Sequence, residues 1–183
     1  AVLFTAHTLY RIGSEGMELK NEVTNNSGLE TIARVGQSFR LPAAFDTLTW
    51  YGKGPWETYA DRKDAALIGL YTSSVAEQHV PFAVPCECGG HEDTRFAALS
   101  DGTHTVQIVG SDDFHFSALP YSIAEYRKAT YEEELPEQTT GTWLILDVAH
   151  AGLGGDTGWT KNIHPEYRVC KGRYSYTFRF HFA

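Results

Sequence analysis

Hydrophobic and polar residues alternate with a period of two along most of this chain. The alternation is clearest near the C-terminal end, where aromatic residues stand at every second position from Tyr174 to Phe182 and polar residues lie between them. Successive side chains of a strand point to opposite faces, so this pattern predicts a strand with one buried aromatic face. Similar patterns predict strands over residues 2–12, 17–23, 32–41, 46–51, 95–99, 105–109, 114–119 and 142–148.

Clusters of turn-forming residues separate these predicted strands, at positions 13–16, 25–28, 101–102 and 171–172. Ser122 followed by Glu125 has the spacing of a capping box and predicts a short helix that continues to about Ala129. A second helical turn is predicted near residues 75–79. Many strands with short turns favour an all-β fold, and we expect one antiparallel β-sandwich domain over residues 1–183 with one or two short helices.

Charge and composition narrow the choice of partners. The net charge of -8 disfavours nucleic acid and anionic membranes as partners, and apolar runs such as residues 65–70 are too short to span a bilayer. The chain opens at Ala1 inside a predicted strand, so we expect an excised C-terminal part of a longer protein. Three cysteines, at positions 86, 88 and 170, argue against a disulfide framework. Free thiols favour the cytoplasm weakly, and a periplasmic location stays open.

The first segment with chemical potential is Trp50–Arg62, where two glycines and a proline turn the chain sharply after a predicted strand. One interpretation is a structural corner in which Arg62 pairs with Asp61 or Glu57. The alternative makes Glu57 or Asp61 a catalytic acid, although the sequence places no partner carboxylate.

A second segment, Pro85–Arg95, contains Cys86, Cys88 and His91, three side chains able to bind a soft metal. A fourth ligand is not evident, and the spacing matches no common zinc signature. We therefore expect no metal site in this chain.

The third segment, Asp147–Trp159, has four glycines within seven residues and predicts a long, tightly folded loop after a strand. Trp159 at its end is either a platform for the apolar face of a sugar ring or an anchor packed onto the sandwich. The eight histidines of the chain are scattered, and His150 is the best functional candidate among them because it opens this loop.

Taken together, these segments resemble the C-terminal, small-chain domain of the large bacterial β-galactosidases of the lactose-hydrolysing type, which are retaining glycoside hydrolases. The resemblance is dense from about Arg34 to the end of the chain. Its motifs are Gly-x-Gly-Pro-x-Glu-x-Tyr-x-Asp-Arg over 52–62, Pro-x-Glu-x-Gly and Thr-Arg within 85–95, Gly-Thr-Trp-Leu over 141–144, Asp-x-x-His-x-Gly-x-Gly-Gly-Asp-x-x-Trp over 147–159, and Gly-Arg-Tyr-x-Tyr over 172–176.

The resemblance implies an antiparallel β-supersandwich related to galactose mutarotases, and it implies that both catalytic glutamates belong to a separate barrel domain. We therefore expect no catalytic residue in this segment. The matching active-site tryptophan is Trp159, which would stack against substrate, with Asp156, Gly155 and His150 supporting the loop. The resemblance also implies Mg²⁺ and Na⁺ in the full-length enzyme, none in this segment, and a homo-oligomeric assembly.

The expected function is therefore that of a β-galactosidase domain. The parent enzyme would hydrolyse terminal β-D-galactosides such as lactose, and this segment would complete the mouth of the active site and stabilise the enzyme. The alternatives are an autonomous carbohydrate-binding module, a mutarotase-like sugar enzyme and a purely structural subunit-contact domain.

Overall fold

The computed structural model describes residues 2–137, 139–154 and 162–183, and in these residues antiparallel strands dominate. One short α-helix and three single-turn 3₁₀ helices connect them. The strands are β1 (Phe4–Gly13), β2 (Gly16–Asn25), β3 (Arg34–Leu41), β4 (Thr47–Gly54), β5 (Leu67–Ser74), β6 (Gly90–Ser100), β7 (Thr105–Leu119), β8 (Thr142–His150) and β9 (Arg173–Phe182). The helix α1 spans Ile123–Lys128, and the 3₁₀ turns span Ala76–Gln78, Glu132–Glu134 and Pro165–Tyr167.

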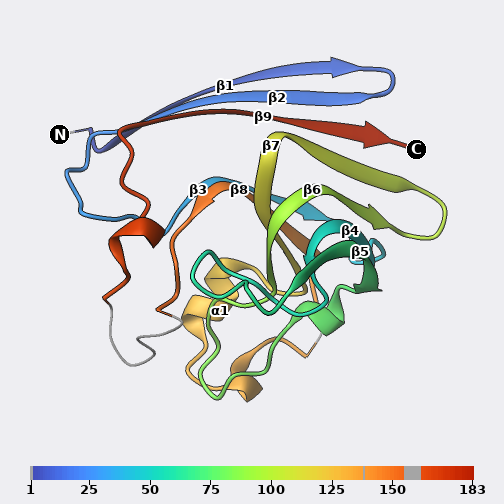
Figure 1. Cartoon of the computed structure of the whole chain (residues 1–183). Helices are drawn as coiled ribbons and strands as arrows, with labels where there is room; N and C mark the ends of the chain where they lie inside the picture. The colour runs from blue at the N-terminus through green and yellow to red at the C-terminus, as the bar shows by residue number, and fades with distance from the viewer. Residues whose placement is uncertain (1, 138, 155–161) are drawn as a thin grey trace.

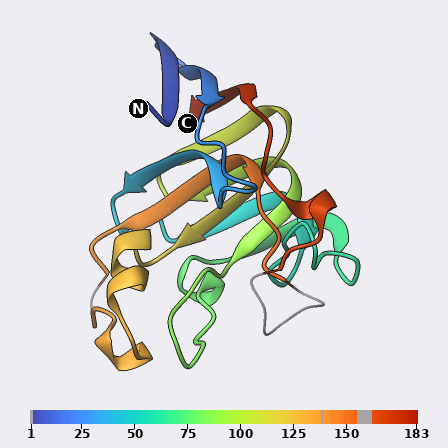
Figure 2. The same ribbon diagram turned by 90° about the vertical axis from the view of Figure 1, so that its left-hand side faces the viewer.

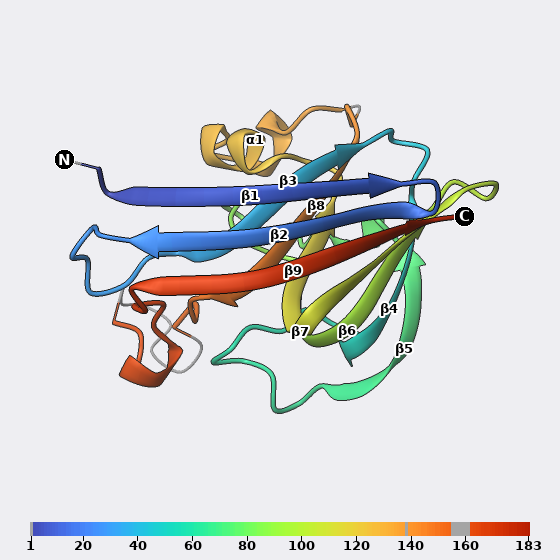
Figure 3. The ribbon, with the colours of Figure 1, turned by 90° about the horizontal axis from the view of Figure 1, so that it is seen from above.

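The strands follow the order β1-β2-β9-β7-β6-β4-β5, and β8 joins β3 to β7. Strand β7 is long enough to belong to two layers. Its first part, Val106–Gly110, pairs with β9, and its last part, His115–Leu119, pairs with β8. Strands β1, β2 and β9 therefore form an upper layer and β3 and β8 lie beneath it (Figures 1 and 3).

The two layers enclose the hydrophobic core. The rings of Phe39 on β3 and Phe180 on β9 lie with their centroids 5.0 Å apart, and the Gln37 amide donates to Asn21 Oδ1 across the same interface at 3.0 Å. Figure 2 shows the β1–β2 hairpin above the β3–β8 pair. Every second side chain of β9 is buried as the alternation predicts, except that Phe182 at its end is 51% exposed.

The all-β antiparallel fold predicted from the sequence is confirmed. The capping box is also confirmed, because Ser122 Oγ accepts the Glu125 N–H and the Glu125 carboxylate accepts the Ser122 N–H. Two corrections concern strands. The predicted strands 105–109 and 114–119 are parts of the single strand β7. The alternation of the sequence does not predict β5, because the exposed Leu67 and Leu70 interrupt it.

Across the described ranges, none of the helices has the length and hydrophobicity needed to cross a membrane.

Candidate functional site

Hydrogen bonds tie the first sequence segment, 50–62, to the second, 85–95. Glu57 Oε2 accepts the backbone N–H of Gly89 at 2.8 Å, and its other carboxylate oxygen pairs with the Arg62 guanidinium. The Tyr59 hydroxyl accepts the N–H of Gly90 at 3.3 Å. Glu57 is thus held as part of a structural corner, as the first interpretation expected, with Arg62 as its partner.

Asp61 connects the first segment to the glycine-rich third segment. Its two carboxylate oxygens accept the backbone N–H groups of Leu153 at 3.0 Å and Gly154 at 2.6 Å. A Cβ atom at Gly152 would lie 2.6 Å from Asp61 Oδ2, so only glycine lets the carboxylate approach this closely. The start of the loop is therefore attached to the corner at residues 57–62.

Of the predicted substrate-binding residues, Trp159, Asp156 and Gly155 lie outside the described residues. His150 is described, and it ends β8. Its Nδ1 donates a hydrogen bond to the Ala151 carbonyl oxygen at 2.7 Å. The centroids of the His150 and Tyr59 rings are 5.3 Å apart.

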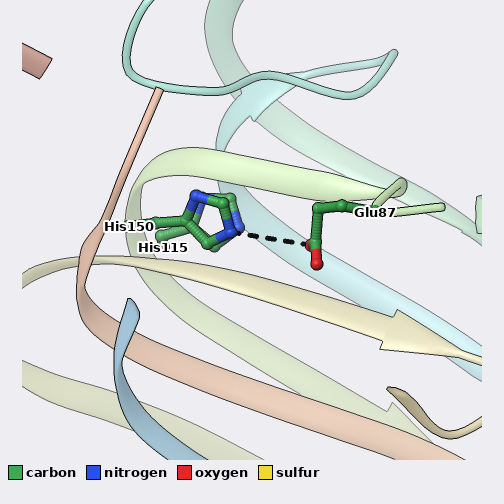
Figure 4. Close-up of side chains that lie close together, drawn as sticks. All are labelled: Glu87, His115 and His150. Carbon is green, nitrogen blue, oxygen red and sulfur yellow. Dashed lines mark ion pairs between the residues drawn. The ribbon is translucent and has the colours of Figure 1, made fainter. Parts of the chain in front are cut away.

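His150 belongs to a compact cluster with Glu87 and His115 (Figure 4). His150 Nε2 lies 3.7 Å from Glu87 Oε1, and the two imidazole rings are stacked with their centroids 4.5 Å apart. The side chains of His115 and His150 are 3% and 4% exposed, whereas that of Glu87 is 29% exposed. We call these three residues the Glu87 cluster.

A β-bulge in β8 helps to form this cluster. The register of β3 against β8 shifts between Val35 and Gly36, which are paired with Ala149 and Asp147, so one residue of β8 is left without a partner. Asp147 and His150 are three residues apart and would face opposite sides of a regular strand. With the extra residue, Asp147 contacts Arg34 at 3.2 Å. His150 lies 3.7 Å from Glu87, which Arg34 also contacts, at 2.9 Å.

A second bulge brings Glu92 to the cluster. The register of β6 against β7 shifts between His91 and Thr94, and Asp93 there has a φ of 52°. Glu92 Oε1 lies 2.8 Å from His115 Nδ1, within hydrogen-bond distance, and accepts from it when the carboxylate is ionised. Burial outweighs the attraction of Lys63 and raises the pKa of Glu92 to about 7.

The charges of the cluster follow from burial and from Arg34. Burial alone would raise the pKa of Glu87, but His150 and the Arg34 guanidinium outweigh it and lower that pKa to about 2. Burial raises the pKa of Asp147 to about 6 despite Arg34, and burial holds the pKa of His115 well below its usual value. At neutral pH the cluster therefore contains an ionised Glu87 and a neutral His115.

The metal ligands considered in the second segment do not share a site. The His91 ring nitrogens contact the Lys53 carbonyl oxygen at 3.2 Å and Gln78 Oε1 at 2.5 Å. The Cys88 thiol is 3.7 Å from the Tyr126 hydroxyl instead, and Cys86 is exposed.

Two pockets open beside these groups. One of about 460 Å³ is lined by Trp56 and the corner that contains Glu57, Asp61 and Arg62. The other, of about 320 Å³, is lined by Glu87 and by apolar side chains including those of residues 119, 123 and 145. Glu87 is thus the member of the cluster that a dissolved molecule can reach.

The sequence motifs contain Glu87 and His150, but they do not predict that these two residues lie next to His115. The signal for His115 is weak, since it is one polar residue between Phe114 and Phe116 in a strand buried on both faces at that point. A polar side chain at such a position must find a buried partner, and this requirement alone could have drawn attention to it.

The chain matches the family described as "Beta galactosidase small chain" over residues 1–180. It is 35% identical over 178 residues to a β-galactosidase of Priestia megaterium, 38% over 164 residues to one of Vibrio cholerae, and 32% over 182 residues to one of Vibrio vulnificus. These alignments cover 97%, 90% and 98% of this chain but only 17%, 15% and 17% of the relatives. A putative aldose 1-epimerase from Escherichia coli is similar in structure with a TM-score of 0.45 and 9% identity, over 98% of this chain and 60% of that one.

Proposed function

Because the chain belongs to the β-galactosidase small-chain family, we propose that it completes the active-site mouth of a β-galactosidase without carrying the catalytic carboxylates. The parent enzyme would hydrolyse terminal β-D-galactosides such as lactose. In this proposal the chain is the C-terminal domain of a longer, homo-oligomeric protein, and the catalytic acid and nucleophile come from elsewhere in that protein.

The observation that carries the proposal is the attachment of the glycine-rich loop by Asp61. A loop rich in glycine has few side chains with which to hold its own conformation. Asp61 supplies two hydrogen bonds from a charged acceptor at the point where the loop leaves the sandwich. Such bonds contribute about 1.5–3 kcal/mol each, so the loop begins from a rigid support, as a substrate-binding loop requires.

The binding role is assigned to Trp159, with Asp156, Gly155 and His150 supporting the loop. An indole offers a broad polarizable surface to the C–H face of a sugar ring. By analogy with bases stacked on aromatic side chains, this contact should be worth about 1–3 kcal/mol. Contacts of this kind position the leaving group without touching the bond that breaks.

The carboxylates of the first segment are poorly suited to catalysis. A retaining glycosidase uses two carboxyl groups about 5–5.5 Å apart on either side of the scissile bond. Here Glu57 and Asp61 both accept backbone N–H groups, so their oxygens serve to hold the main chain.

Mg²⁺ and Na⁺, implied for the full-length enzyme, fit poorly with the potential metal ligands of the described residues. Both ions prefer oxygen ligands, whereas the Glu87 cluster offers two imidazole nitrogens and one carboxylate. In this proposal those ions are bound by other parts of the parent enzyme.

The proposal is tested in the full-length enzyme with Trp159→Ala. We expect substrate or acceptor affinity to fall roughly 5- to 150-fold, the equivalent of about 1–3 kcal/mol, while the melting temperature changes little. Tyr131→Ala is the matched control, since Tyr131 is an aromatic side chain that is 60% exposed, and we expect wild-type kinetics from it. A large fall in melting temperature with unchanged kinetics would show that Trp159 is a structural anchor.

A second arm uses the 183-residue chain alone. It should not hydrolyse a chromogenic β-galactoside, and calorimetric titration with lactose should give no binding heat. Turnover that disappears in Glu57→Gln or Asp61→Asn would contradict the proposal, and saturable lactose binding would favour an autonomous carbohydrate-binding module.

A mutarotase-like activity is the second candidate, because His150 and Glu87 face each other at 3.7 Å. Such an enzyme needs an acid and a base on either side of a sugar. The 4% exposure of the His150 side chain leaves a sugar little access to it. Catalysed interconversion of α- and β-galactose by the isolated chain, lost in Glu87→Gln, would favour this second candidate.

A further inference from the structure

The Glu87 cluster has an arrangement that the proposed function does not use. Its three potential ligand atoms, one from each side chain, all lie within 4.8 Å of one another. His115 Nε2 is buried and has no hydrogen-bond partner in the structure. A buried nitrogen lone pair without a partner is costly. Figure 4 shows the two stacked imidazoles side by side, facing the Glu87 carboxylate.

The second nitrogen of each imidazole is already bonded in the manner of a metal ligand. His150 Nδ1 donates to the Ala151 carbonyl oxygen at 2.7 Å, and His115 Nδ1 lies 2.8 Å from the Glu92 carboxylate, to which it donates when that group is ionised. Metal-binding histidines characteristically donate their other N–H to a carboxylate or a backbone carbonyl, which fixes the tautomer. Both Nε2 atoms are therefore left as acceptors on the inner side of the cluster.

We propose that Nε2 of His115, Nε2 of His150 and the carboxylate of Glu87 bind a zinc ion. Two imidazoles and one carboxylate form a ligand set typical of zinc. The ion would link the 83–89 segment to β7 and β8, and its fourth position would be open on the Glu87 side, where the 320 Å³ pocket lies. This proposal replaces the expectation from the sequence that the chain has no metal site.

Zinc binding would require the three side chains to move closer together and the two imidazole rings to tilt apart. Tetrahedral zinc with bonds of about 2.0–2.1 Å places its ligand atoms about 3.4 Å apart. The Glu87 Oε1 and His150 Nε2 atoms are already 3.7 Å apart. The three ligand atoms lie within 4.8 Å of one another, so the other pairs must close by up to about 1.4 Å. The imidazole rings are inclined by only 22°, and zinc binding would also tilt them until both lone pairs point at the ion.

The neighbouring charges set how strongly the ion is held. Arg34 is a cation next to Glu87 and opposes a second cation there. Its guanidinium is also paired with Asp147 at 3.2 Å, and Glu92 adds a further carboxyl group behind His115. These acids offset the Arg34 charge, so the cluster can accept a divalent ion.

The test is a metal titration of the 183-residue chain after treatment with a chelator. We expect one Zn²⁺ per chain by calorimetry, and a melting temperature that rises with Zn²⁺ concentration. His115→Gln and Glu87→Gln should each abolish stoichiometric binding. Glu92→Ala, which removes the carboxylate beside His115 but no proposed metal ligand, should weaken binding roughly 10- to 100-fold.

His104→Gln is the matched control. His104 also lies beside a carboxylate, that of Asp101, but on an exposed turn, and we expect wild-type binding from this variant. Cys86→Ser and Cys88→Ser should likewise bind one Zn²⁺.

Three outcomes would overturn the proposal. They are the absence of stoichiometric binding by the wild-type chain, undiminished binding by folded His115→Gln or Glu87→Gln chains, and loss of binding in either cysteine variant. Where a variant does not fold, the absorption spectrum of Co²⁺ bound to the wild-type chain tests the site instead. Visible bands of four-coordinate cobalt without a thiolate charge-transfer band support the proposed ligands, and a thiolate charge-transfer band contradicts them. None of these measurements involves a galactoside, so they fail or succeed independently of the proposed function.

Discussion

The buried imidazole of His91 should make the domain sensitive to mild acid. His91 has no exposed surface, and its ring lies against Trp50 with their centroids 4.2 Å apart. Burial lowers the pKa of His91 to about 3, well below the usual value of about 6.5. The change we propose is His91→Gln, which keeps a hydrogen-bonding group but removes the titration.

The sign and size of the effect follow from proton binding in the two states. Below pH 6.5 the unfolded chain takes up a proton at His91 that the folded chain refuses until about pH 3. Stability should therefore fall as the pH drops through this window, by about 1.4 kcal/mol per pH unit. At pH 5, which is about 1.5 units below the unfolded pKa, the loss due to His91 is about 2 kcal/mol.

The assay is urea unfolding of the wild-type and His91→Gln chains at pH 7 and pH 5. The variant should be less stable at pH 7, because its amide fills the site less well than the imidazole. The decisive quantity is the change in unfolding free energy between the two pH values, which should be about 2 kcal/mol larger for the wild type. Other groups, including His115, titrate in both chains and cancel in this comparison. Equal changes in both chains would refute the reasoning, since they would mean that His91 is protonated equally in the folded and unfolded states.

Three further predictions concern reactivity and packing. Burial raises the pKa of Cys88 to about 11, so iodoacetamide at pH 8 should modify Cys88 only after unfolding, whereas it should alkylate the exposed Cys86 in the folded chain. Mass spectrometry can show this, and labelling of Cys88 in the folded chain would contradict its burial. A Cβ at Gly36 would lie 2.1 Å from a backbone oxygen of β8, so Gly36→Ala should lower the free energy of unfolding by about 1–3 kcal/mol, whereas Gly13→Ala, with open space around it, should show no such overpacking penalty. Ser122→Ala removes the helix cap and should cost about 1 kcal/mol in chemical denaturation, and an unchanged midpoint would show that the cap contributes nothing.

Local sequence patterns were sufficient to predict a strand wherever one of its faces is exposed to solvent and the other is buried. The alternation from Tyr174 to Phe182 predicts both β9 and the face that it buries, because the period of two follows from the strand itself. The Ser122–Glu125 spacing predicts the start of α1 for the same kind of reason, since a capping box needs only four consecutive residues. By contrast, β5 could not be recognised from the exposed Leu67 and Leu70, whose place on an edge strand only the sheet order reveals.

The candidate site divides in the same way. Composition and motif order by themselves determined the all-β class, the family resemblance and the importance of the segments that contain Glu87 and His150. Only the tertiary structure brought His115 to them, because its strand is buried on both faces at that point and follows no one-sided alternation. The bulge that brings Asp147 to Arg34 and His150 to Glu87 depends on how β8 is paired with β3. Such a register is a property of two strands far apart in the sequence.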